Sequence, residues 1–111
     1  MPESAPDARI VLTTAANPEE ASELGRTLVE EQLAACATLV PAVQSIYRWE
    51  GRIAYSAETL LLLKTVLDRS PALESRLFEL HSYQVPEFLV LPVEAGGRSY
   101  LDWLDATLRR V

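Results

Sequence analysis

The sequence predicts an α+β domain of the ferredoxin-like type, in which helices cover one face of an antiparallel sheet. Strand-like and helix-like segments follow one another in the order β-α-β-β-α-β, and a further helical segment ends the chain. The length of 111 residues is that of one domain. We expect this domain over residues 9–111 and a disordered tail over residues 1–8, which show no periodic pattern.

The first strand is expected to run directly into the first helix. Residues 9–15, RIVLTTA, are apolar and β-branched, and Asn17-Pro18 then supplies the residue types that cap and begin a helix. The apolar residues beyond this point fall on one stripe at helical spacing: Ala21, Leu24, Gly25, Leu28, Val29 and Leu33. Such a stripe predicts a helix that packs on a sheet.

A long hairpin is expected over residues 36–67. Its two apolar strands join near Glu50-Gly51, where Gly51 can adopt the positive φ of a tight turn. Pro41 has no N–H to donate, so the first strand is either bulged there or lies at a sheet edge. Fifteen extended residues span about 50 Å, whereas a compact domain of this length is about 34 Å across. The hairpin should therefore project beyond the domain; the alternative is two shorter strands joined by a loop.

The far part of this hairpin carries large apolar side chains on both strands: Ile46, Tyr47, Trp49, Ile53 and Tyr55. An exposed strand of this kind promotes aggregation unless another chain covers it. We therefore expect an obligate homo-oligomer.

Three further elements complete the order. Ser70-Pro71 repeats the arrangement of a capping residue followed by a proline and so predicts the start of a second helix, which closes near His81. Residues 87–93, EFLVLPV, predict the fourth strand, and Ser99 is expected to cap a short last helix.

Composition excludes several classes of partner. With 16 acidic and 10 basic residues the chain repels nucleic acid and anionic lipid, and it contains no apolar run long enough to span a membrane. We expect no nucleic-acid and no membrane partner. The single cysteine, Cys36, cannot form an intrachain disulfide and suits a reducing compartment, so a cytoplasmic location is expected.

The stretch LHSYQVPE, residues 80–87, holds the chain's one histidine. His81, Tyr83, Gln84 and Glu87 place an imidazole, a phenol, an amide and a carboxylate on one turn. A histidine at a helix end is equally typical of a structural role, because the helix dipole favours it there. One histidine and one cysteine are too few for a structural zinc site in a single chain.

Other candidate residues lie in the hairpin. Cys36 is typical of a small buried side chain, and Lys64, which shares a strand face with apolar residues, must reach a rim, a carboxylate or an anion. Trp49 and Glu50 near the hairpin tip fit either a ligand site or an interface anchor. Phosphate-binding glycine loops, nucleophile elbows and CxxC or HExxH motifs are absent from the sequence, so we assign no catalytic residue.

Five stretches together resemble the CutA family of divalent-cation tolerance proteins, in the family's order and spacing: LAACATLVP (33–41), SIYRWEGRI (45–53), LLLLKT (60–65), LHSYQVPEFLVLPV (80–93) and YLDWL (100–104). The resemblance runs from about residue 9 to the end of the chain. It implies a ferredoxin-like subunit in a homotrimer similar to PII-type signalling proteins, with the long hairpin wrapped on neighbouring subunits.

The resemblance also implies site residues. Copper binding in some bacterial members is associated with a cysteine in the first strand and two adjacent histidines, whose positions here are Thr13, Leu80 and His81. Only His81 matches, so it is the single metal candidate. The other family-motif residues are present, and those expected to line clefts between subunits are Cys36, Trp49, Glu50, Lys64, His81, Tyr83 and Glu87.

The functional expectation is a non-enzymatic homotrimer that serves in divalent-cation tolerance and the response to metal ions. It would bind copper, another divalent metal or a small ligand in intersubunit clefts, without a required cofactor. One alternative is a structural or signalling trimer that anchors a partner without metal chemistry. Another is an undetected hydrolase or lyase that uses His81, Tyr83 and Glu87.

Overall fold

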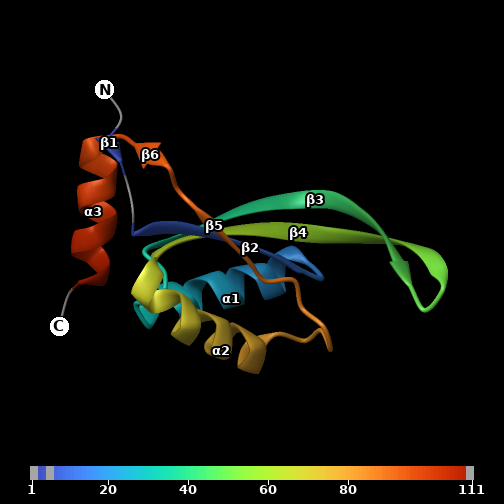
Figure 1. Cartoon of the computed structure of the whole chain (residues 1–111). Coiled ribbons are helices and arrows are strands. Elements are labelled where there is room, and N and C mark those ends of the chain that lie inside the picture. The colour runs from blue at the N-terminus through green and yellow to red at the C-terminus, as the bar shows by residue number, and fades with distance from the viewer. Residues whose placement is uncertain (1–2, 5–6, 110–111) are drawn as a thin grey trace.

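The computed structural model of the protein describes residues 3–4 and 7–109. Its main elements are β2 (Ala8–Ala15), α1 (Pro18–Glu30), β3 (Cys36–Trp49), β4 (Arg52–Val66), α2 (Ser70–Leu80), β5 (Leu89–Pro92) and α3 (Arg98–Leu108). A 3₁₀ turn, η1 (Leu67–Arg69), precedes α2 (Figure 1). Strands β2 to β5 form an antiparallel sheet in the order β3-β4-β2-β5. The predicted ferredoxin-like α+β fold is confirmed.

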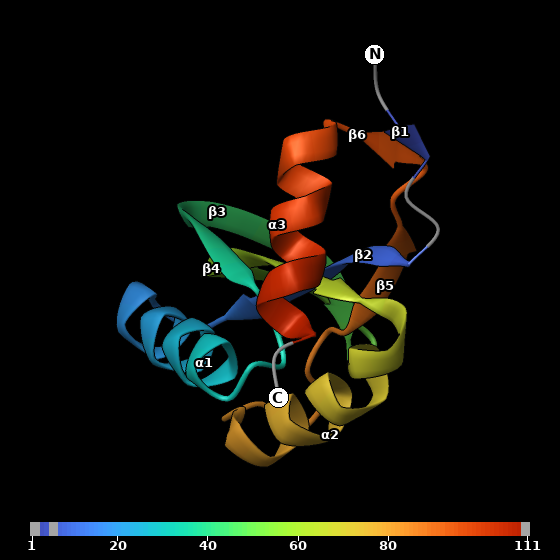
Figure 2. The same cartoon turned by 90° about the vertical axis from the view of Figure 1, so that its left-hand side faces the viewer.

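Two short strands were not predicted. β1 (Glu3–Ser4) pairs antiparallel with β6 (Ala95–Gly96), close to the start of α3 (Figure 2). In place of the expected tail over residues 1–8, the structure therefore has β1 and the first residue of β2, whereas residues 1–2 and 5–6 lie outside the described residues. A two-residue strand carries no periodic signal, which is why sequence patterns do not reveal it.

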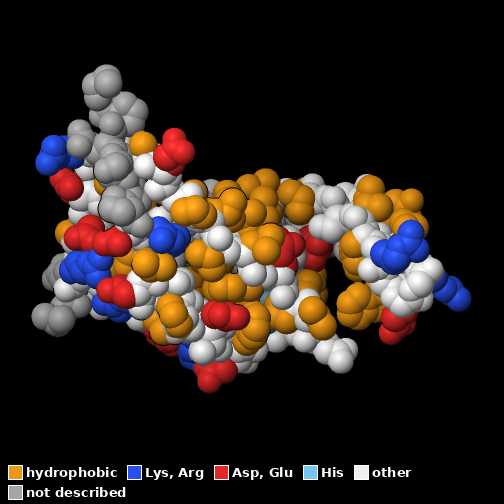
Figure 3. Space-filling model, viewed as in Figure 1, with side chains coloured by type: hydrophobic (Ala, Val, Ile, Leu, Met, Phe, Trp, Pro, Cys, Tyr) orange, Lys and Arg blue, Asp and Glu red, His pale blue; other side chains and the backbone are white. Residues whose placement is uncertain are grey.

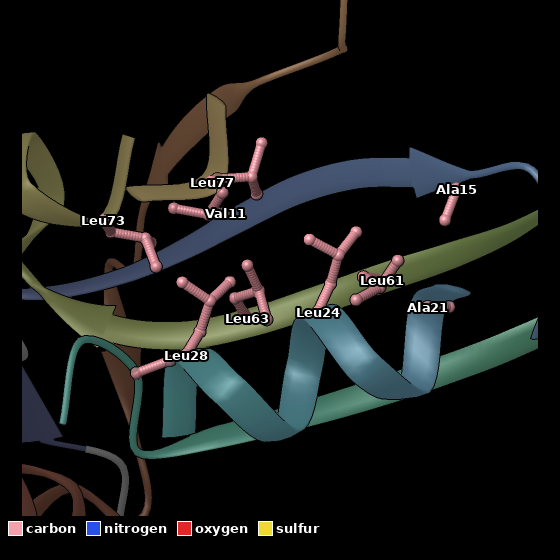
Figure 4. Packing of buried hydrophobic residues seen from close by; sticks show 10 residues of the cluster. Val11, Ala15, Ala21, Leu24, Leu28, Leu61, Leu63, Leu73 and Leu77 are labelled. Carbon is pink, nitrogen blue, oxygen red and sulfur yellow. The ribbon is translucent and has the colours of Figure 1, made fainter. Parts of the chain in front are cut away.

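The main core lies between the sheet and helices α1 and α2, which cover the same face (Figure 1). Leucines from the helices meet the inward residues of β2 and β4 there (Figure 4): Val11, Leu24, Leu28, Leu61, Leu63, Leu73 and Leu77. Gly25 lets α1 approach closely, because a Cβ at that position would lie 3.0 Å from the Cβ of Ala37. α3 packs on the opposite face at one end only, through Leu104 and Leu108 against Ala35 and Val66.

The predicted capping residue is confirmed for one helix of three. Asn17 caps α1, its side chain accepting a hydrogen bond from the Glu20 amide at 2.8 Å, as predicted. Ser70 is not a cap: η1 runs directly into α2, so Ser70 is already helical and its hydroxyl donates to the Leu67 carbonyl. Ser99 also lies within a helix, because α3 begins one residue earlier, after Gly97.

The hairpin has the predicted length and turn. Glu50 (φ 51°) and Gly51 (φ 79°) both take the left-handed conformation, as in the two-residue turns that match the twist of paired strands. The register of β3 breaks between Val40 and Val43, around Pro41, so this edge strand is bulged where a proline requires it. The described residues extend 44 × 29 × 22 Å, and the hairpin end projects past both α1 and α2 (Figure 1). No described helix is long and apolar enough to cross a membrane.

Candidate ligand-binding cleft

A cleft of about 590 Å³ lies between the hairpin and the loop that follows α2. Figure 3 shows the molecule hollowed between the hairpin end and the main body, with acidic side chains beside the hollow. The size is typical of small-molecule sites. Its lining is mixed aromatic, hydroxylic and acidic: Thr14, Ser45, Ile46, Tyr47, Trp49, Ser56, Glu58, Tyr83, Gln84, Val85 and Glu87.

The two sides of the cleft are joined by Tyr83 and Glu58. The Tyr83 hydroxyl donates to Oε2 of Glu58 at 2.6 Å, which ties the loop to β4. Glu58 is only 8% exposed. Burial, followed by the hydrogen bond to Glu58 and the charge of that carboxylate, raises the pKa of Tyr83 far above its usual value. Tyr83 is therefore a permanent donor to this carboxylate at ordinary pH.

His81 supports the cleft from behind and is 8% exposed. Its Nε2–H donates to the Thr14 carbonyl oxygen at 2.7 Å, and its Nδ1 accepts from the Tyr83 amide at 3.0 Å. Because a carbonyl oxygen can only accept, these contacts define a neutral ring protonated at Nε2. The ring fixes the start of the loop relative to the end of β2.

Glu20 holds the same loop from α1. Its Oε2 accepts from the Ser82 amide at 3.1 Å, and its Oε1 accepts from the Ala16 amide at 3.2 Å. Partial burial by itself would raise the pKa of Glu20, but the hydrogen bonds from Ser82 and Ala16 outweigh it, and the pKa is lowered. The loop wall is thus attached to β2, β4 and α1 by side chains.

Four of the seven predicted site residues fall at this cleft. Trp49, Tyr83 and Glu87 line it, and His81 lies behind its wall. Glu50 occupies the hairpin turn and is not part of the lining.

Cys36 and Lys64 are opposite each other on β3 and β4, away from the cleft lining. The Lys64 ammonium donates to the Thr38 hydroxyl and lies 3.8 Å from the Cys36 thiol. Burial, together with the neighbouring Cys36 thiol, raises the pKa of Tyr100 on α3. The structure therefore places four of the seven predicted residues at the cleft, two in a cluster on the sheet and Glu50 in the hairpin turn.

Both ring nitrogens of His81 are engaged in this geometry, because one carries the proton and the other accepts a hydrogen bond, so the expected metal role would require the ring to release one of these contacts. Neither nitrogen has a free lone pair for a metal. Thr13 is fully buried with a hydroxyl that has no hydrogen-bond partner among the described residues, and Leu80 packs against the core. The described residues contain no group of three or more His, Cys, Asp or Glu side chains that could hold a metal ion.

Sequence reasoning missed Glu58, the buried carboxylate of the cleft. The signal that could have revealed it is a lone acid followed by an apolar run, in AETLLLL (57–63). Tyr47 and Ser56 were also missed as a pair; their hydroxyls lie 2.8 Å apart across the hairpin.

The fold and the cleft define a ferredoxin-like domain with an extended hairpin and an acidic, aromatic hollow beside it. The family model of the CutA1 divalent ion tolerance protein matches residues 9–107. The chain belongs to this family.

Relatives and solved structures agree with this assignment. The divalent-cation tolerance protein CutA of Thermus thermophilus is 47% identical over 95 residues, which cover 86% of this chain and 92% of the relative. The CutA of Citrobacter koseri is 45% identical over 106 residues, 96% of this chain and 92% of the relative. The solved CutA of Synechococcus elongatus superposes with a TM-score of 0.93 at 39% identity, covering 97% of this chain and 96% of that one. The expected CutA resemblance is confirmed.

Proposed function

We propose that this CutA-family chain works in divalent-cation tolerance as a homotrimer that binds a small molecule, with the cleft beside the 81–87 loop as the binding site. The observation that carries the proposal is the cleft itself. It has the volume of a small-molecule site, and three side chains, His81, Tyr83 and Glu20, hold one wall in place. A wall fixed in this way is preorganised for a ligand.

The trimer is supported by the sheet face that α1 and α2 leave open. Strand register places seven apolar residues on this face beyond the part that α3 covers: Ile10, Leu12, Val40, Leu60, Leu62, Leu89 and Leu91. Leu89 and Leu91 are 54% and 42% exposed. An apolar sheet face of this extent needs a cover, and further copies of the chain provide it in our proposal. The projecting hairpin would then reach a neighbouring subunit, and the cleft beside it would lie at the subunit boundary.

In this proposal, copper and other divalent cations bind the protein only weakly. The histidine expected to bind metal is already bonded through both nitrogens, and the cleft carboxylates Glu58 and Glu87 offer oxygen ligands without a soft partner. We therefore propose a role in metal tolerance that depends on small-molecule binding and not on a tight metal cage. We also propose that the protein is not an enzyme.

Two measurements test the proposal together. Light scattering should give three times the chain mass of 12.3 kDa. Amide NMR spectra recorded with a panel of cationic, neutral and anionic fragments should show shifts at residues 81–87 and at the Trp49 indole. A trimer whose cleft responds to no fragment would instead favour a module that anchors a partner. Catalytic turnover lost in Tyr83→Phe would favour the enzyme alternative.

A further inference from the structure

The charge of the cleft is entirely of one sign. Two carboxylates, Glu58 and Glu87, belong to the lining, and among the described lining residues there is no lysine or arginine. Glu58 is more than nine-tenths buried, and no Lys or Arg of the described residues forms an ion pair with it. A buried carboxylate without a positive partner is costly. The protein keeps one here, at the edge of a hollow large enough for a ligand.

One oxygen of Glu58 remains available to a ligand. Oε2 accepts from the Tyr83 hydroxyl, whereas Oε1 accepts no hydrogen bond from any described residue. Oε1 keeps some exposed surface, and Glu58 belongs to the cleft lining. The hydrogen bond from Tyr83 holds the carboxylate in place but brings no positive charge.

Aromatic rings make up much of the remaining wall. Tyr47 and Trp49 come from β3, and Tyr83 comes from the loop. Tyr47 and Trp49 are both partly exposed, so their rings are accessible. The face of an aromatic ring attracts a cation through its quadrupole, and such rings beside a carboxylate form the usual environment for ammonium groups.

We propose that the cleft selects organic cations, that is, small amines or quaternary ammonium compounds, with Glu58 as the buried counter-ion and the three aromatic rings as the apolar wall. This inference rests on the proposed function and gives the chemical class of its ligand. The hydroxyls of Ser45, Ser56 and Thr14 add hydrogen-bonding groups for a ligand that also carries hydroxyls.

The test compares choline with 3,3-dimethyl-1-butanol, which has the same shape with carbon in place of the charged nitrogen. Calorimetry at constant ionic strength should show choline binding about tenfold more tightly than the neutral compound. Glu58→Gln keeps an acceptor for Tyr83 but removes the charge, and should abolish the preference. Glu50→Gln removes the same charge from the hairpin turn, outside the cleft lining, and should leave the preference intact. Far-UV circular dichroism checks that both variants fold.

Equal binding of the two compounds to the wild-type protein would overturn the cation proposal without any variant. A preference for choline that survives Glu58→Gln would overturn the role of Glu58. The fragment panel separates these failures from failure of the cleft itself. If neutral or anionic fragments shift the 81–87 amides and cations do not, only the ligand class is wrong. If no fragment of any charge shifts them, the small-molecule function is wrong as well.

Discussion

Nε2 of His81 at the end of α2 lies 2.7 Å from the carbonyl oxygen of Thr14 at the end of β2. The two residues are 67 positions apart, and this contact, with the Tyr83 amide on the other ring nitrogen, makes His81 a structural support of the cleft wall.

His81→Ala should destabilise the protein by about 2 kcal/mol, because the Thr14 carbonyl and the Tyr83 amide each lose a buried partner. Denaturant unfolding at fixed protomer concentration measures this change. Copper affinity, measured by competition against a chelator, should be the same in the variant and the wild type. A large loss of copper affinity in His81→Ala would show that the ring releases one of its hydrogen bonds to bind metal.

Thr13→Val should stabilise the protein by about 1 kcal/mol. The Thr13 hydroxyl is buried and finds no hydrogen-bond partner in the part of the chain that the structure describes, so replacing it by a methyl group of the same shape removes a desolvation cost. Thr65→Val is the matched control, since the equally buried Thr65 hydroxyl donates to the Leu33 carbonyl at 2.7 Å. The free energy of unfolding of Thr65→Val should be lower than that of the wild type by about 1 to 2 kcal/mol. Equal effects of the two substitutions on the melting temperature would contradict the view that the Thr13 hydroxyl lacks the hydrogen bond that the Thr65 hydroxyl makes.

Leu91→Glu should reduce the mass in light scattering from trimer to monomer, because it places a charge on the apolar sheet face that we propose to be covered. Leu67→Glu is the control: Leu67 is similarly exposed but lies in η1, after the end of β4. An assembly that tolerates Leu91→Glu would show that the open face is not the interface.

Glu20→Gln should reduce stability at pH 7 by about 0.5 kcal/mol or less, since the carboxylate is partly exposed. The pKa of Glu20 is lowered in the folded state, so its contribution is present above the ordinary value of 4.5 and is lost as the pH falls through the folded value. The free energies of unfolding of Glu20→Gln and of the wild type should therefore become equal in acid. Glu19→Gln, in the same helical turn but without a hydrogen bond to the loop, corrects for the loss of a charge near the helix start. A difference that persists unchanged at pH 3 would contradict the link to ionisation.

Much of the fold could be predicted because its signals are local. Asn17-Pro18 marks the start of α1, Gly51 marks the hairpin turn, and Pro41 marks the bulge in an edge strand. The predicted caps of α2 and α3 were wrong because serine beside a helix start fits several positions, and only the preceding backbone decides among them.

The site was less predictable because its contacts are distant in sequence. The stretch around His81 and Tyr83 was singled out by its composition, but the partners that decide its chemistry, Thr14, Glu20 and Glu58, come from three other elements. A histidine at a helix end resembles a metal ligand until the groups that bond its nitrogens are known.

We infer that the cleft, and not the His81 ring, binds the ligand. A crystal soaked with copper(II) and choline, with anomalous scattering measured at the copper edge, distinguishes the two sites. We predict choline density against Glu58, Trp49 and Tyr83 and no copper peak at either nitrogen of His81. Copper bound to His81, with the Tyr83 amide displaced and the cleft empty, would contradict the account.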